Sequence, residues 1–124
     1  QGRFKSFPVQ EEVYFLRLCR YVEANAMRAR LAKRAEDWPW CGLYARRHRG
    51  KPFRLSAWPV DRPRNWTAEV NDPLGREELR AVRTSVNRGR PLGDADWVQS
   101  TARRLGLEFT LRNPGRPRLN RENQ

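Results

Sequence analysis

Apolar residues recur with a helical period in the first third of this 124-residue chain. Between residues 11 and 33 they return every three or four positions, which places them on one face of an α-helix. That stripe consists of Phe15, Leu18, Cys19, Val22 and Ala26. The charged residues of the segment are expected in solvent, namely Arg17, Arg20, Glu23 and Arg28. The pattern predicts one long helix over residues 11–33, with the stripe toward the core.

A short strand is expected before this helix, over residues 3–9. Phe4 and Phe7 are its apolar positions, and Pro8 ends regular pairing because proline has no amide hydrogen to donate. The aromatic segment 35–40 ends the helix and turns the chain. A short helical patch is expected next. It covers residues 43–47, before an irregular stretch rich in proline.

A second helical region is expected in the C-terminal half. Residues 73–87 predict a helix, and the glycine-containing turn 88–93 leads to another helix, which Asp94 caps and Gly106 ends. Two helices joined by a short turn form a helix-turn-helix or a helical hairpin. The chain then divides into part of one domain over residues 1–45, an irregular basic linker over 46–72, a two-helix module over 73–108 and a disordered basic tail over 109–124.

The charge of the chain favours a polyanionic partner. Lys and Arg number 26 against 14 Asp and Glu, which gives a net charge of +12. Most of these cations are arginines, whose planar guanidinium suits contacts to phosphates and bases. A genome rich in G and C would also favour arginine codons, whatever the function. We expect nucleic acid as the partner.

Other features of the sequence concern its compartment. Cys19 and Cys41 lie outside any CxxC motif and do not form the disulfide framework of a secreted protein. No apolar run reaches the roughly 20 residues that a membrane-spanning helix needs, and no signal-peptide pattern is present at the start. These features predict a reduced, cytoplasmic protein at the nucleoid with no membrane partner. The sequence leaves a homodimer open.

Tyr21 and Asn25 are four residues apart in the expected helix and therefore lie on one side of it. A tyrosine hydroxyl can attack a phosphodiester and form a covalent phosphotyrosine. An asparagine oxygen one turn away could hold a divalent metal that polarises the same phosphate. The spacing is also common at the margin of a helix core, so both residues fit an ordinary structural role.

Three segments in order resemble the C-terminal half of the single-tyrosine transposase domain, in particular the REP-associated tyrosine transposases. They are GRFKS at residues 2–6, RYVEANAMRA at 20–29 and EDWPW at 36–40. The resemblance covers about residues 1–44. It implies an α+β fold, in which a partial ferredoxin-like domain with one short strand and the tyrosine-bearing helix precedes a mostly helical basic extension. It also implies a bacterial mobile-element enzyme that binds hairpins in single-stranded DNA, and cuts and rejoins strands through a 5′-phosphotyrosine in DNA transposition and recombination.

The same resemblance assigns roles to two residues. The tyrosine that aligns with Tyr21 is the family's nucleophile, and the residue that aligns with Asn25 joins two histidines in holding Mg²⁺ or Mn²⁺. That histidine pair precedes residue 1 in the family's order. The one histidine here, His48, lies in a run of arginines that opposes metal binding, and Ala26 stands where the family has proline. We therefore expect this chain to be inactive alone and not to bind the metal.

Basic residues in several segments are candidate DNA contacts. They are Arg3, Lys5, Arg28, Arg46, Arg47, Arg49, Lys51, Arg88, Arg90, Arg116 and Arg118. Two copies of Gly-Arg-Pro, at 89–91 and 115–117, are similar to the core of AT-hooks, which lie in A·T minor grooves. Four tryptophans could stack on unpaired bases or anchor the fold, namely Trp38, Trp40, Trp58 and Trp66.

Two other interpretations fit the sequence. A non-catalytic DNA-binding module would use the two-helix region and the AT-hook-like elements, and the change Tyr21→Phe would leave its activity intact. A small RNA-binding protein of ribosomal type would prefer RNA to DNA at equal salt.

Overall fold

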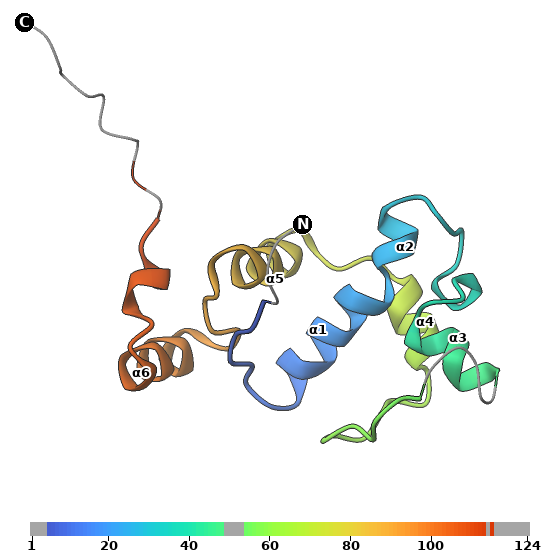
Figure 1. Ribbon diagram of the computed structural model, residues 1–124, viewed down its shortest axis with the longest axis horizontal. Coiled ribbons are helices and arrows are strands. Elements are labelled where there is room, and N and C mark those ends of the chain that lie inside the picture. Colours follow the sequence, from blue (N-terminus) through green and yellow to red (C-terminus); the bar gives the residue numbers. More distant parts are fainter. Residues whose placement is uncertain (1–4, 49–53, 114, 116–124) are drawn as a thin grey trace, which may run out of the picture.

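The computed structural model describes residues 5–48, 54–113 and 115 (Figure 1). Six α-helices and two 3-10 turns make up its regular structure in those ranges. They are α1 (Val13–Glu23), α2 (Asn25–Arg28), η1 (Ala35–Asp37), α3 (Gly42–Arg47), α4 (Trp66–Asn71), α5 (Arg76–Arg88), α6 (Ala95–Leu105) and η2 (Glu108–Leu111). Figure 1 shows α2, α3 and α4 gathered around one end of α1, with α5 beside it and α6 farther away.

The expected α+β, partial ferredoxin-like fold is wrong, because the described residues form no strand or sheet. Within the described part of residues 3–9, the expected strand is reduced to an isolated parallel bridge between Val9 and Leu92. Leu92 N donates to the Pro8 carbonyl at 2.9 Å, and Gln10 N donates to the Leu92 carbonyl at 2.8 Å. Pro8 has no amide hydrogen to donate across the bridge, so the ladder cannot extend toward the N-terminus.

The helix expected over residues 11–33 is shorter and interrupted. It begins at Val13, turns at Ala24 between α1 and α2, and ends at Arg28. Arg30 adopts a positive φ of 60°, and Leu31 N donates back to the Ala26 carbonyl at 2.8 Å, which closes the helix end. The expected apolar stripe is also only partly buried, since Val22 is 54% exposed.

The core lies where α1, α3, α4 and η1 meet. Its buried members are Ala24, Ala35, Cys41, Leu43, Trp66 and Val70, with half-buried Leu16, Cys19, Met27, Trp38, Tyr44 and Trp58 packed against them. Trp66 and Val70 belong to α4, which lies within the segment 46–72 that the sequence predicted to be an irregular linker. Bulky aromatic side chains from that segment and from the residues before it therefore hold the helices together.

Glu23 is buried in this core, although the sequence placed it in solvent. Its Oε2 accepts a hydrogen bond from Trp66 Nε1 at 2.6 Å, and its Oε1 pairs with Arg46 Nη1 at 2.7 Å. A Cβ at position 42 would lie 2.4 Å from Glu23 Oε1, so Gly42 leaves the space that the carboxylate fills. One carboxylate thus connects α1, α3 and α4.

Asn71, the last residue of α4, makes a second polar link to η1. Its Nδ2 donates to Glu36 Oε2 at 2.7 Å and to the Thr67 carbonyl at 2.9 Å. Its Oδ1 accepts from Ala35 N at 2.9 Å. Because Ala35 and Glu36 are buried, these bonds satisfy polar groups that water does not reach.

The C-terminal helices match the sequence prediction closely. Asp94 caps α6 by accepting from Trp97 N at 2.9 Å, and Gly106 ends it with a positive φ of 69°. Gly89 ends α5 in the same conformation. The Gln10 side chain donates to Asp94 Oδ2 at 2.9 Å and accepts from Asp94 N at 2.8 Å, which joins the start of the chain to α6.

Acid should unfold the protein partly through Glu36 and Asp94. Burial alone raises the pKa of Glu36, but the hydrogen bond from Asn71 and the charges of Arg34 and Arg47 hold it below its ordinary value. The bonds from Trp97 N and Gln10 likewise lower the pKa of Asp94. Each carboxylate therefore stabilises the fold fully above its ordinary pKa of about 4, and this stability is lost as pH falls through the lower folded pKa.

Urea unfolding at pH 7 and at pH 2 measures this dependence. We expect the wild-type protein to lose stability at the lower pH, and the loss to be smaller in Glu36→Gln, which cannot titrate at that position. An equal loss in both proteins would show that Glu36 does not contribute to the acid response.

Candidate functional site

Tyr21, Asn25 and Arg28 form one cluster on the surface of α1 and α2. The turn at Ala24 keeps the helical hydrogen bonds Ala24 N to Arg20 O and Arg28 N to Ala24 O, both 3.0 Å, so the three side chains stay on one side. The guanidinium carbon of Arg28 lies 4.0 Å from the centre of the Tyr21 ring. Arg28 Nη2 also donates to the Tyr21 carbonyl and to Asn25 Oδ1.

The cluster is positively charged and open to solvent. Asn25 is exposed, whereas Tyr21 and Arg28 are half-buried. Burial lowers the pKa of Arg28, the Tyr21 side chain opposes that shift, and the nearby charge of Arg83 on α5 adds to it. A guanidinium keeps its proton in proteins, so two cationic groups face this region. An anion placed beside Tyr21 would therefore be stabilised.

The described residues do not fit a Mg²⁺ or Mn²⁺ site. Asn25 is the one ligand that the resemblance implies within them, and its Oδ1 already accepts from a cation, Arg28. Nowhere in the described ranges do three His, Cys, Asp or Glu side chains gather in a way that could hold a metal ion. His48 stacks on Tyr44 with ring centres 3.9 Å apart, and its Nδ1 lies 3.0 Å from the Tyr44 carbonyl.

The other candidate DNA contacts lie in different surroundings. Lys5 and Arg47 are exposed. Arg46 pairs with Glu23 and covers the Trp58 ring at 4.8 Å, so it belongs to the core network. Arg88 Nε and Arg90 Nε both donate to the Thr110 carbonyl, at 3.4 Å and 2.8 Å. Outside the described residues lie Arg3, Arg49, Lys51, Arg116 and Arg118.

The four tryptophans divide between core and surface. Trp66 is 2% exposed, and Trp58 packs edge-on between Phe15 and Trp66. Trp38 is half-buried against the core. Trp40 is 67% exposed, which makes it the one tryptophan of the four with a largely open ring.

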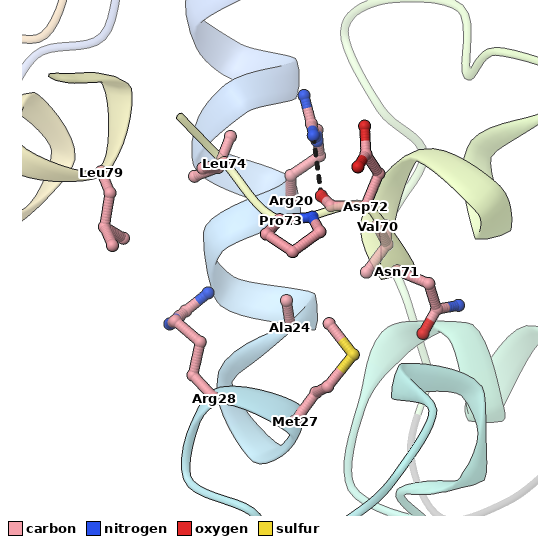
Figure 2. A pocket seen from close by; sticks show the side chains of 10 residues that line it. All are labelled: Arg20, Ala24, Met27, Arg28, Val70, Asn71, Asp72, Pro73, Leu74 and Leu79. Atoms are coloured by element: carbon pink, nitrogen blue, oxygen red, sulfur yellow. Dashed lines mark hydrogen bonds between the residues drawn. The ribbon is translucent and has the colours of Figure 1, made fainter. Parts of the chain in front are cut away.

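Sequence reasoning missed a pocket of about 300 Å³ beside the cluster (Figure 2). Its lining comes from α1, α2, the end of α4, α5 and the link between α4 and α5. The lining residues are Arg20, Ala24, Met27, Arg28, Val70, Asn71, Asp72, Pro73, Leu74 and Leu79. Arg20 positions one wall, because its Nε donates to the Glu69 carbonyl at 3.1 Å and its Nη2 to the Asp72 carbonyl at 2.9 Å.

Comparison with known proteins gives no family for this chain. Searches with protein-family models, among curated proteins and among solved structures each found no match. Among the described residues, no helix combines the length and the apolar character that crossing a membrane requires.

Proposed function

We propose that the chain is the C-terminal, DNA-binding portion of a single-tyrosine DNA transposase, with single-stranded hairpin DNA as its substrate and Tyr21 as its nucleophile. The observation that supports this proposal is the cluster of Tyr21, Asn25 and Arg28, whose members come from the segment with the strongest resemblance to that family. It presents a phenol next to a guanidinium on an accessible surface, and the whole chain carries a net charge of +12.

The proposed chemistry is a transesterification. The Tyr21 oxygen attacks a phosphorus of the DNA backbone, the bond from phosphorus to the 3′ oxygen breaks, and the phenol proton ends on the released 3′ hydroxyl. The product is a 5′-phosphotyrosine, which a 3′ hydroxyl can attack in reverse to join strands. Arg28 would hold the negatively charged phosphate beside the phenol, because its guanidinium already lies over the ring.

A non-catalytic DNA-binding module is the second candidate. One observation favours it, since the Asn25 oxygen is bonded to Arg28 and the described residues contain no cluster suited to a metal ion. The structure gives less support to a module that binds DNA through AT-hooks. The first copy of Gly-Arg-Pro is held as a turn, because Arg88 and Arg90 bond to the Thr110 carbonyl.

Arg28→Ala should weaken binding to hairpin DNA with an unpaired flank. Loss of a charged hydrogen bond to phosphate predicts an affinity about tenfold lower. It also predicts that the slope of log affinity against log salt falls by about 0.7, the value for one contact to a single strand. Fluorescence anisotropy across a salt series measures both quantities. Arg83→Ala should act in the same direction, because Arg83 lies near Arg28.

Arg104→Ala is the matched control, because it removes an equal charge from the exposed surface of α6, at a distance from α2 (Figure 1). We expect it to change affinity less than about threefold. Equal losses in Arg28→Ala and Arg104→Ala would show that DNA is held by net charge without a site at the cluster.

A further inference from the structure

The pocket beside the cluster has an apolar interior. Ala24, Met27, Pro73 and Leu74 supply alkyl or thioether surface, and α5 contributes Leu79. In Figure 2, Arg28 and Leu79 lie on one side of the pocket and Met27 and Asn71 on the other, with Ala24 between them. The volume of about 300 Å³ is at the lower end of the range for small-ligand sites, which begins near 300 Å³.

Two polar side chains at this pocket, those of Arg20 and Asn71, are already engaged with the protein. Arg20 donates to the Glu69 and Asp72 carbonyls, and Asn71 bonds to Glu36, Thr67 and Ala35. The interior therefore offers a ligand mainly van der Waals contact. The flat faces of a nucleobase can make this contact, while its polar edges stay toward solvent.

The rim differs from the interior because it carries cations. Arg28 borders the pocket and also covers the Tyr21 ring. Its hydrogen bonds to the Tyr21 carbonyl and to Asn25 Oδ1 both use Nη2, and a guanidinium has five N–H donors in all. A phosphate attached to a base in the pocket would meet this guanidinium.

We propose that this pocket receives one unpaired nucleobase of single-stranded DNA, while Arg28 holds the adjacent phosphate. The inference rests on the DNA-binding part of the proposed function and adds the site at which a strand is gripped. It places the bound nucleotide next to Tyr21, because the same arginine contacts both. Recognition by apolar contact predicts little preference among the four bases.

Met27 provides a direct test, because it is the chain's single methionine and lines the pocket. Protein labelled with ¹³C at the methionine methyl gives one signal from inside the site. Oligothymidylate should move that signal upfield, since a base packed on the methyl group shields it. An abasic oligomer of equal length has the same phosphates and no bases, and it should leave the signal in place.

The outcomes separate this inference from the proposed function. Anisotropy that shows DNA binding with an unmoved methyl signal would overturn the pocket and leave DNA binding intact. An equal shift with the abasic oligomer would also overturn it, because the base would not be the cause. If neither oligomer binds at low salt, the proposed function fails and this inference with it.

Leu79→Trp gives an independent check by filling the pocket from α5. In the wild-type protein, removing the bound base from a hairpin flank should lower affinity about tenfold. In Leu79→Trp that abasic penalty should disappear, because the base no longer has a place to bind. A penalty of the same size in both proteins would contradict the assignment.

Discussion

Glu23→Ala should destabilise the protein by about 3–5 kcal/mol, the usual cost of breaking a buried ion pair from one side. The change removes the acceptor of Trp66 Nε1 and the partner of Arg46, whose side chain is only 20% exposed. A buried indole N–H then loses its hydrogen-bond acceptor, and a mostly buried guanidinium loses its negatively charged partner. Small domains have total stabilities of about 5–15 kcal/mol, so much of the protein would unfold near 37 °C.

Chemical denaturation followed by tryptophan fluorescence measures this loss, because Trp58 and Trp66 lie in the affected core. Glu11→Ala is the matched control, since Glu11 is exposed in the turn before α1, and we expect a change below about 0.5 kcal/mol. A similar, small effect of both substitutions would show that Glu23 does not hold α1, α3 and α4 together.

Under the proposed function, Tyr21→Phe should abolish covalent strand cleavage once the histidine pair that the resemblance implies is supplied. The substitution removes the attacking oxygen, so we expect the rate of cleavage to fall by at least about three orders of magnitude. DNA affinity should change less than twofold, because the ring and its contact with Arg28 remain. The covalent adduct is measured on a denaturing gel with 5′- and 3′-labelled hairpin DNA.

Tyr14→Phe is the control for this prediction. Tyr14 is a half-buried tyrosine on the same helix with an arginine, Arg17, 4.9 Å from its ring centre. We expect it to keep full cleavage activity. Cleavage that survives in Tyr21→Phe would exclude Tyr21 as the nucleophile and favour the non-catalytic module. The 124-residue chain alone should form no adduct, and an adduct at Tyr21 would contradict that expectation.

The sequence predicted those elements whose signals are local. Asp94 and Gly106 bound α6 as expected, because a cap residue and a left-handed glycine act within one turn. The expected α+β fold class was wrong because the pairing of strands is not a local signal. A strand needs a partner, and Pro8 has no amide hydrogen with which to extend the bridge of Val9 and Leu92 toward the N-terminus.

Interactions between distant segments were not predictable from periodicity. Glu23 is separated from Trp66 by 43 positions, so nothing in its own helix shows that it is buried. Arg20 likewise bonds to carbonyls 49 and 52 positions away. At the site, the four-residue spacing correctly placed Tyr21 and Asn25 on one side of the helix. The pocket was missed because its wall at residues 70–72 belongs to the segment expected to be a linker.

A competition experiment tests the central claim, that this chain binds single-stranded hairpin DNA. A labelled hairpin with an unpaired flank is displaced at fixed salt by the same unlabelled hairpin, by an A·T-rich duplex of equal charge, and by the equivalent RNA hairpin. We expect the DNA hairpin to compete at least about tenfold better than either rival. A duplex that competes equally well would contradict it in favour of a minor-groove module, and stronger competition by RNA would indicate an RNA-binding protein.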